Sequence, residues 1–220
     1  MKDFIIEDGV LKEYIGKETI GVDIIIPDGV IKIGEKCFRH MQIKYVSFPV
    51  SVKKIGEEAF YNCWTISKIG PFIVKEIGKS AFEACGFTAF VMNDGVVNIG
   101  ESAFAQCTKM SKIKLPDSVE RIGVGAFKFC ESATTVELPK RLSEIPAECF
   151  CGCISLKDIK IPKTVEKIGS NAFAFCVNLQ KIDFYGTKED WLAIKKSDDW
   201  KYESKRLKFV KCVNGILELK

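Results

Sequence analysis

Ten cysteines and a single histidine, His40, are the residues of this 220-residue chain that could carry the most varied chemistry. A thiolate is a nucleophile and a metal ligand, and histidine is the commonest general base, so a cysteine beside a histidine would indicate nucleophilic catalysis. Paired cysteines would instead indicate disulfides, and the run Cys149-Phe-Cys151-Gly-Cys153 suggests a zinc site. Which chemistry is possible depends on the elements that hold these side chains.

Those elements repeat. The phrase Ile-Gly-x-x-Ala-Phe-x-x-Cys recurs at nearly constant spacing, starting at Ile33, Ile55, Ile77, Ile99, Ile122, Ile145 and Ile168. Its phenylalanine is present in every copy, as Phe38, Phe60, Phe82, Phe104, Phe127, Phe150 and Phe173. All copies but the first end in cysteine: Cys63, Cys85, Cys107, Cys130, Cys153 and Cys176. A motif that recurs at so constant a period predicts a repeat architecture.

Each repeat contains two strand signals. Between the phrases, Ile113 and Leu115 alternate with polar residues as in a half-buried strand, and Pro116 should end that strand because it lacks a backbone N–H. A second short strand is expected over residues 119–122. The glycine of the phrase should then permit a tight corner, and Ala-Phe-x-x-Cys should form a single helical turn with its phenylalanine inward. One such unit is too small to bury its own apolar residues, so neighbouring units must stack.

The full pattern, Leu/Ile-x-x-Ile-x-Leu-Pro-x-x-Val-x-x-Ile-Gly-x-x-Ala-Phe-x-x-Cys, resembles the BspA-type leucine-rich repeat over residues 20–187. The resemblance implies an α/β fold: a right-handed leucine-rich-repeat solenoid with short parallel strands and one helical turn per repeat, capped at both ends. We expect a single repeat domain over 1–220, with an N-terminal cap at 1–21, repeats at 22–187 and a C-terminal cap at 188–220.

The ends of the chain carry their own signals. Asp8-Gly9 resembles the turn of the family's opening hairpin. Thr187 and Asp190 have the spacing of a helix capping box, which predicts an amphipathic helix over 188–196 with Trp191 and Ile194 turned inward. Asn214-Gly215 predicts a hairpin turn between two final strands.

The repeat answers most of the cysteine question. Six cysteines occupy one repeated position, where they should behave as small buried hydrophobic residues. Stacked repeats about 5 Å apart would bring them near disulfide spacing, but side chains in register point the same way, which is poor geometry for a bond. Cys149 and Cys153 belong to the repeat, so zinc lacks ligands. Cys151 lies outside the pattern and could be an exposed, reactive thiol.

Nothing else in the sequence indicates catalysis. His40 has no nucleophile motif beside it and is interpreted as a surface polar residue. Phosphate-binding, dinucleotide-binding, zinc-protease and serine-hydrolase motifs are absent from the sequence. We therefore expect a protein that is not an enzyme and that uses no cofactor and no metal. The alternative is an enzyme whose undetected site is built around Cys151.

Composition narrows the partners. The net charge of +4 is too small to indicate nucleic acid, and the basic, aromatic segment 188–211 is better explained as a solvated cap. No run of about 18 apolar residues exists, so no membrane insertion is expected. The first eight residues do not form a signal peptide. The family resemblance nevertheless implies the cell surface or secretion, with an export signal removed, whereas many unpaired thiols favour a reducing cytoplasm.

A partner should contact the outward side of the first strands. One outward column comprises Ile25, Ser47, Gly70, Val91, Lys114, Glu137, Lys160 and Asp183, and a second comprises Asp23, Tyr45, Lys68, Ala89, Lys112, Thr135, Asp158 and Lys181. The charges of the C-terminal half alternate in sign and can pair with one another. The N-terminal half is apolar or small, so we place the binding site at Ile25, Tyr45, Ser47 and Val91, with Tyr45 as anchor. This patch could instead be scattered, or covered by the N-terminal hairpin.

The resemblance implies non-catalytic recognition of a protein or a surface glycan, as in an adhesion module. A monomer is expected. A structural spacer domain of a larger surface protein is a further alternative.

Overall fold

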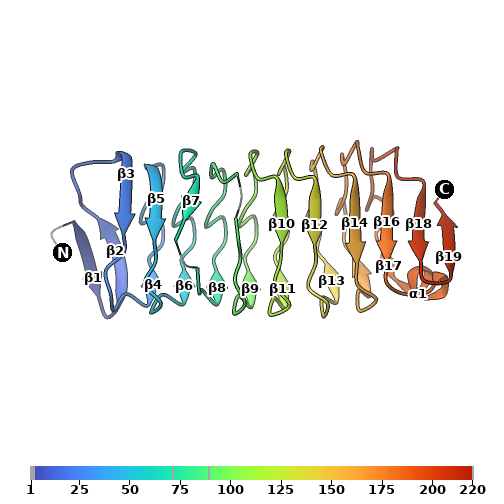
Figure 1. Ribbon diagram of the computed structural model, residues 1–220, viewed down its shortest axis with the longest axis horizontal. Helices are drawn as coiled ribbons and strands as arrows, with labels where there is room; N and C mark the ends of the chain where they lie inside the picture. Colours follow the sequence, from blue (N-terminus) through green and yellow to red (C-terminus); the bar gives the residue numbers. More distant parts are fainter. Residues whose placement is uncertain (1–2, 71, 89, 220) are drawn as a thin grey trace.

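The computed structural model describes residues 3–70, 72–88 and 90–219. It is an elongated β-solenoid of about eight turns whose short strands stack in two rows along the long axis (Figure 1). The parallel strands and the stacking of repeats confirm the solenoid that the repeated phrase predicts.

The first row comprises the first strands of the repeats. One sheet has the order β3 (Ile20–Ile25), β5 (Gln42–Ser47), β7 (Lys68–Ile69). The other has the order β10 (Lys112–Lys114), β12 (Thr135–Glu137), β14 (Asp158–Ile161), β16 (Lys181–Phe184), β18 (Phe209–Cys212), β19 (Gly215–Glu218). All pairs are parallel except β18 with β19. In the repeats that carry the proline, the first strand ends before it and a turn closes there, as in the bond from the Val119 N–H to the Pro116 carbonyl (3.1 Å).

The second row is made of shorter strands. A seven-stranded sheet has the order β1 (Phe4–Glu7), β2 (Val10–Tyr14), β4 (Lys32–Ile33), β6 (Lys54–Ile55), β8 (Glu76–Ile77), β9 (Asn98–Ile99), β11 (Arg121–Ile122). A three-stranded sheet has the order β13 (Glu144–Ile145), β15 (Lys167–Ile168), β17 (Lys195–Lys196). The second strand of a repeat exists as predicted, but it is very short.

The predicted helical turn in each repeat is wrong. Some backbone N–H groups of this segment bond within their own turn, and others donate to carbonyls of the next repeat. The Phe38 N–H donates to the Ala59 carbonyl and the Phe60 N–H to the Ala81 carbonyl (both 2.8 Å). Two residues of nearly every turn have positive φ, which a right-handed helix forbids. They are Lys36, His40, Glu58, Asn62, Ser80, Ala84, Ser102, Gln106, Gly125, Phe129, Glu148, Gly152, Asn171 and Phe175. We call these stacked turns the turn ladder. Hydrogen bonding between repeats is favoured over a helical turn because stacking brings the N–H groups of one turn close to the C=O groups of the next.

The glycine of the phrase also acts differently from the prediction. These glycines lack the positive φ that would mark a tight corner. Instead the backbones of successive repeats approach so closely there that no side chain fits. A Cβ placed on Gly100 would lie 2.6 Å from the carbonyl carbon of Gly78, and one on Gly56 would lie 2.8 Å from the Gly34 oxygen.

The core is a column of stacked phenylalanine rings. The repeated phenylalanines are at most 1% exposed. Successive rings lie nearly parallel, from 4.9 Å between Phe38 and Phe60 to 5.9 Å between Phe127 and Phe150. Tyr14 closes the column at one end (5.9 Å) and Trp200 at the other (6.1 Å). The inward phenylalanine of the sequence prediction is confirmed.

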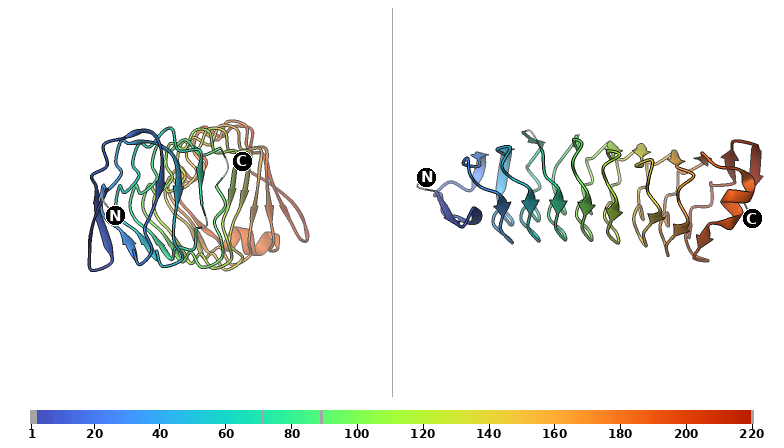
Figure 2. Two further views of the ribbon diagram at one scale, coloured as in Figure 1. Left: turned by 60° about the vertical axis from the view of Figure 1, so that its left-hand side comes forward. Right: turned by 90° about the horizontal axis from the view of Figure 1, so that it is seen from below.

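Both ends carry the expected hairpins (Figure 2). Asp8 and Gly9, both with positive φ, join β1 to β2. The capping box of Thr187 and Asp190 begins α1 (Lys188–Ala193), which ends earlier than predicted because residues 195–196 pair with β15 as β17. The turn between β18 and β19 is at residues 213–214, just before the predicted position.

Candidate docking face

The outward columns of the first strands lie as the sequence predicts. Asp23, Tyr45 and Lys68 are neighbours across β3, β5 and β7, and Ile25 is the neighbour of Ser47. In the second sheet the columns run from Lys112 and Lys114 to Lys181 and Asp183. Ala89 lies outside the described residues. Parallel, in-register pairing is what converts a period in sequence into a column in space.

Three of the four candidate residues come together. Ile25 is 70% exposed, and Tyr45 and Ser47 are half-buried beside it. The ring of Tyr45 leans across Gly70, where an added Cβ would lie 2.7 Å from the Tyr45 hydroxyl oxygen and 3.2 Å from Ser47 Oγ. The Tyr45 side chain can adopt this position because Gly70 has no side chain that would clash with it. We call Ile25, Tyr45 and Ser47 the Tyr45 cluster.

Val91 is not part of this cluster. Its side chain is 72% exposed. It lies two repeats beyond Ser47, which is about 10 Å at the usual strand spacing. The first-strand sheet is interrupted between β7 and β10, so Val91 sits in an irregular segment rather than in a ladder. The sequence carries a signal for this break, because Gly70 stands at a strand position in the third repeat and Asn93 replaces the proline in the fourth.

The N-terminal hairpin does not cover the Tyr45 cluster. Strand β2 pairs with β4 in the other row of strands, so the hairpin continues the opposite sheet (Figure 1). Ile20, which the repeat pattern did not single out, is 71% exposed at the start of β3. Its place between a polar segment and Gly21 was the available signal.

The C-terminal half of the face is charged and partly self-paired. Lys114 lies 3.6 Å from Glu137, as the alternating signs predict. Asp183 instead pairs with Lys181 of its own strand (3.0 Å), so the predicted pairing of Asp183 with Lys160 is not the one that forms. An open groove of about 740 Å³ follows the strand ends here, between Met92 and Tyr185. Exposed pairs of this kind contribute only about 0–1 kcal/mol each.

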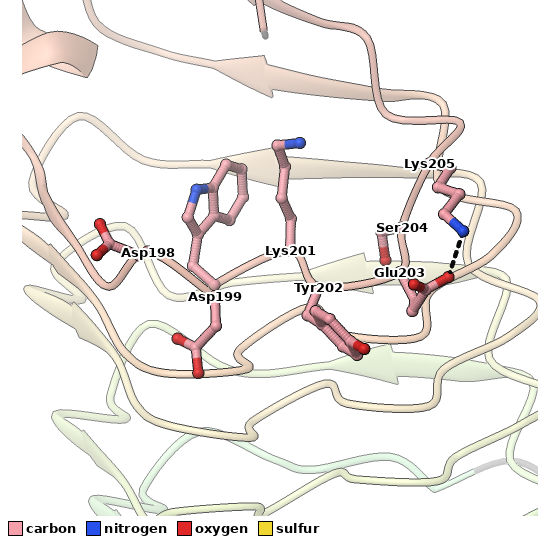
Figure 3. Close-up of a pocket in the computed structure, with 8 residues that line it drawn as sticks. Asp198, Asp199, Lys201, Tyr202, Glu203, Ser204 and Lys205 are labelled. Atoms are coloured by element: carbon pink, nitrogen blue, oxygen red, sulfur yellow. Dashed lines mark ion pairs between the residues drawn. The ribbon is translucent and has the colours of Figure 1, made fainter.

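A second hollow, of about 360 Å³, is lined by residues 198–205 on the last turn (Figure 3). Most of its polar groups already serve the fold. Asp199 accepts a hydrogen bond from Ser170 (2.7 Å), and Lys205 pairs with Glu203 (2.8 Å). Ser204, which is buried, donates to the Phe173 carbonyl (2.6 Å). The hollow is therefore the capped end of the turn ladder.

The six repeated cysteines are buried and free, as predicted. Each thiol donates to the carbonyl of the phenylalanine in the preceding repeat, as from Cys63 to Phe38 (3.0 Å) and from Cys107 to Phe82 (3.2 Å). Burial raises the pKa of the Cys63, Cys107 and Cys176 thiols to about 12. These thiols pack and donate hydrogen bonds, and they are not nucleophiles at neutral pH.

The prediction of an exposed, reactive Cys151 is wrong. This side chain is only 8% exposed, because its position in the turn ladder is enclosed by the neighbouring turns. Burial, and next the carboxylate of Glu148, raises the pKa of the thiol, and the nearby Lys128 opposes this only in part. A reactive cysteine needs the opposite shift.

His40 is exposed, as expected. Its Nδ1 lies 3.0 Å from the side-chain nitrogen of Asn62, and its ring meets Tyr61 edge-on at 5.5 Å. Across the described ranges, no group of three or more histidine, cysteine, aspartate or glutamate side chains could hold a metal ion. In the same ranges, no helix is long and apolar enough to cross a membrane.

Comparison with known proteins now identifies the repeat. A family model of the BspA type leucine-rich repeat region matches residues 14–70 and 75–191, in six copies. The chain belongs to this family. As a BspA-type repeat protein it is similar in structure to a leucine-rich repeat protein of Treponema pallidum, with 30% identity, a TM-score of 0.74, and coverage of 81% of this chain and 88% of the other.

Two further solved structures share the BspA-type fold. A leucine-rich repeat protein of Bacteroides ovatus has 23% identity and a TM-score of 0.62, and the match covers 96% of this chain and 71% of the other. One from Eubacterium ventriosum has 17% identity and a TM-score of 0.52, with coverage of 92% and 71%. A search of curated proteins found no match.

Proposed function

We propose that this chain is a non-catalytic recognition module that binds a protein or a surface glycan through the Tyr45 cluster. The chain belongs to a family of solenoid repeats, and solenoids expose extended outer surfaces that serve for binding, which supports this function. The observation that carries the proposal is Ile25, an isoleucine left 70% exposed in an ordered sheet beside a half-buried tyrosine.

The cluster has the composition of an anchor point. Fully burying an isoleucine side chain contributes about 1.5–3 kcal/mol, and tyrosine is enriched among residues that dominate interface energies. Ser47 adds a hydroxyl for a directional hydrogen bond. The self-paired charges of the C-terminal half are better suited to a solvated rim than to the centre of a contact.

The test is a binding assay with host surface-protein extract and, separately, a glycan array. Each captured ligand is identified and its saturable affinity is measured. We expect Ile25→Asp and Tyr45→Asp each to weaken binding at least about tenfold, because a charge would be buried at the contact. Val124→Asp, at an exposed apolar position outside the face, is the matched control. Equal affinities for the wild type and both cluster variants would refute the site.

Val91→Asp measures how far the contact extends. A loss comparable to that of Ile25→Asp would mean that one partner spans the interrupted sheet. Unchanged affinity would confine the contact to the Tyr45 cluster.

We also propose that the chain acts at the cell surface. Free thiols ordinarily favour a reducing compartment, but buried thiols with raised pKa values resist oxidation and disulfide exchange. The thiols therefore do not oppose export. Protease shaving of intact host cells should release peptides of this chain, and recovery only after lysis would contradict the proposal.

A further inference from the structure

The C-terminal half of the turn ladder carries a cluster of exposed apolar side chains. They come from its last four turns and are between 41% and 54% exposed: Phe129, Ile154, Phe175, Val177 and Tyr202. We call these five side chains the turn patch. In the earlier repeats the position of Phe129 is held by polar or small residues, which are His40, Asn62, Ala84 and Gln106. The apolar character is therefore confined to one end of this face.

Local packing holds the aromatic rings of the turn patch in place. The Phe129 ring leans over Gly152 of the next repeat, where an added Cβ would lie 2.7 Å from the ring carbon Cε1. Phe175 meets Tyr202 edge-on, with 5.6 Å between the ring centroids, and Figure 3 shows the tyrosine projecting from the last turn. At about 200 Å² for each whole side chain, the exposed parts of the three aromatic residues amount to about 300 Å². Apolar patches of this size often mark contact surfaces.

The turn patch is complementary to itself when one copy is turned end for end. Successive repeats are in register here, as in the bond from the Ser155 N–H to the Glu131 carbonyl (3.2 Å). One outward column of the last four turns therefore comprises Glu131, Ile154, Val177 and Lys205. In an antiparallel pair of copies this column faces itself, and Ile154 meets Val177 of the other copy. Glu131 then meets Lys205 at both ends of the contact, so opposite charges flank an apolar centre.

The column that contains the phenylalanines fits the same register. The two-fold axis crosses the solenoid between the sixth and seventh repeats and lies in the plane of the contact, so each column faces itself. Phe175 of one copy then lies against Gly152 of the other, where the Phe129 ring is placed. Glu203 falls opposite the backbone of Phe129, whose ring leans away over the next repeat. Apolar rings therefore meet apolar rings at the centre.

The charged residues at the border also find partners. Lys205 already pairs with Glu203 of its own turn (2.8 Å), and Figure 3 marks this ion pair. In the antiparallel pair Lys205 would lie between that carboxylate and Glu131 of the other copy. Lys128 occupies the turn position equivalent to Tyr202 and would face its ring in the other copy, which is a cation–π arrangement.

We infer that the chain forms a symmetric dimer through the turn patch, with the two solenoids antiparallel. An isologous contact of this kind closes at two copies. The C-terminal cap leaves the face open, because α1 lies between β16 and β17 at the corner that joins the two strand rows, and β18 and β19 extend the first-strand sheet. The Tyr45 cluster lies on first strands at the other end of the solenoid and stays exposed. This inference departs from the monomer expected from the sequence and does not depend on the proposed docking function.

Sedimentation velocity over a wide concentration range tests the inference on the full chain. The patch is small for a stable interface, so we expect a reversible dimer with a Kd of roughly 1–100 μM. Phe175→Asp should weaken dimerisation at least about tenfold, because it buries a charge among apolar rings. Trp64→Asp is the matched control, since Trp64 occupies the column of Ile154 in the second repeat, outside the contact, and is 52% exposed. Circular dichroism establishes that each variant folds.

Charge variants test the antiparallel orientation. Glu131→Lys and Lys205→Glu should each weaken self-association several-fold, because each substitution places like charges at both ends of the contact. An equimolar mixture of the two variants should dimerise about as well as the wild type, since both ends of the mixed dimer join opposite charges. An effect confined to one chain would not produce this recovery.

Four results would overturn the inference. They are a wild type that stays monomeric up to its solubility limit, association that continues beyond the dimer, association indifferent to Phe175→Asp, and a mixture of charge variants that associates no better than either variant alone. None of these variants lies in the Tyr45 cluster, so failure here leaves the docking proposal standing.

Discussion

At the scale of the residue, the repeated cysteine combines two properties that no other small side chain has together. It is small and apolar enough to fit beside the phenylalanine column. Its S–H also donates to a carbonyl of the preceding repeat, as from Cys107 to Phe82 (3.2 Å). Alanine at this position would leave a small cavity and a carbonyl without its hydrogen-bond donor, and serine would bury a more polar group. The cysteine content of the chain thus reflects packing.

The buried thiols make stability fall at alkaline pH. The pKa of the Cys63 and Cys107 thiols rises from 9.0 to about 12 on folding, so above pH 9 the unfolded chain releases protons that the folded chain retains. Their contribution is complete below pH 9 and declines as pH rises towards about 12. Urea unfolding at intervals across this range should show the decline. It should be shallower in a Cys63→Ala, Cys107→Ala double variant, and an unchanged slope would contradict the assignment.

At the scale of the element, the turn ladder decides which residues the repeat tolerates. Its turns gain hydrogen bonds between repeats and accept two left-handed residues in return. The same close stacking leaves no room for a side chain at the glycine position of most repeats. The sixth repeat is the exception, because Pro146 stands where the other repeats have glycine. Backbone proximity, rather than a special φ, sets this requirement.

Two glycine substitutions separate these causes. Gly100→Ala should lower the free energy of unfolding by about 1–3 kcal/mol, because overpacked sites cost this much. Its added Cβ would meet the backbone of Gly78 at 2.6 Å. Gly125→Ala should cost only about 1 kcal/mol, because its positive φ is mildly strained for alanine. The nearest neighbour of that Cβ is the flexible side chain of Lys128. Chemical denaturation measures both, and a larger loss for Gly125→Ala would point to turn conformation instead.

At the scale of the whole molecule, stability depends on how the stack of repeats is closed. Each repeat contacts only its neighbours, so the outermost apolar layers need caps. The ring of Trp200 packs edge-on against Phe173 and closes the phenylalanine column. The centroid of the Trp191 ring lies 6.0 Å from that of Trp200. Hairpin β1–β2 and Tyr14 close the other end.

Removing the aromatic cap should therefore be costly. We expect Trp200→Ala to lower the free energy of unfolding by about 3–5 kcal/mol, the usual range for a buried tryptophan. Trp64→Ala is the matched control, since that side chain is 52% exposed. This surface substitution should cost much less. Urea denaturation followed by circular dichroism gives both values, and similar losses would mean that the cap does not close the core.

The solenoid, its columns and its family follow from the amino-acid sequence without any coordinates. The reason is that a constant period forces equivalent residues into register, so the inward phenylalanines, the buried cysteines and the outward column from Lys112 to Lys181 are predictable. Local chemistry also places both hairpins and the start of α1.

Three features follow from the folded chain alone: how the turns bond, which side chains the neighbouring turns enclose and where each sheet ends. The hydrogen bonding of the turns could not be predicted from the local sequence, because their N–H groups donate to carbonyls of another repeat. Cys151 is enclosed by neighbouring turns, and Val91 is separated from the Tyr45 cluster by an interrupted sheet. Burial and the edges of sheets arise from contacts between repeats, and a period in sequence does not contain them.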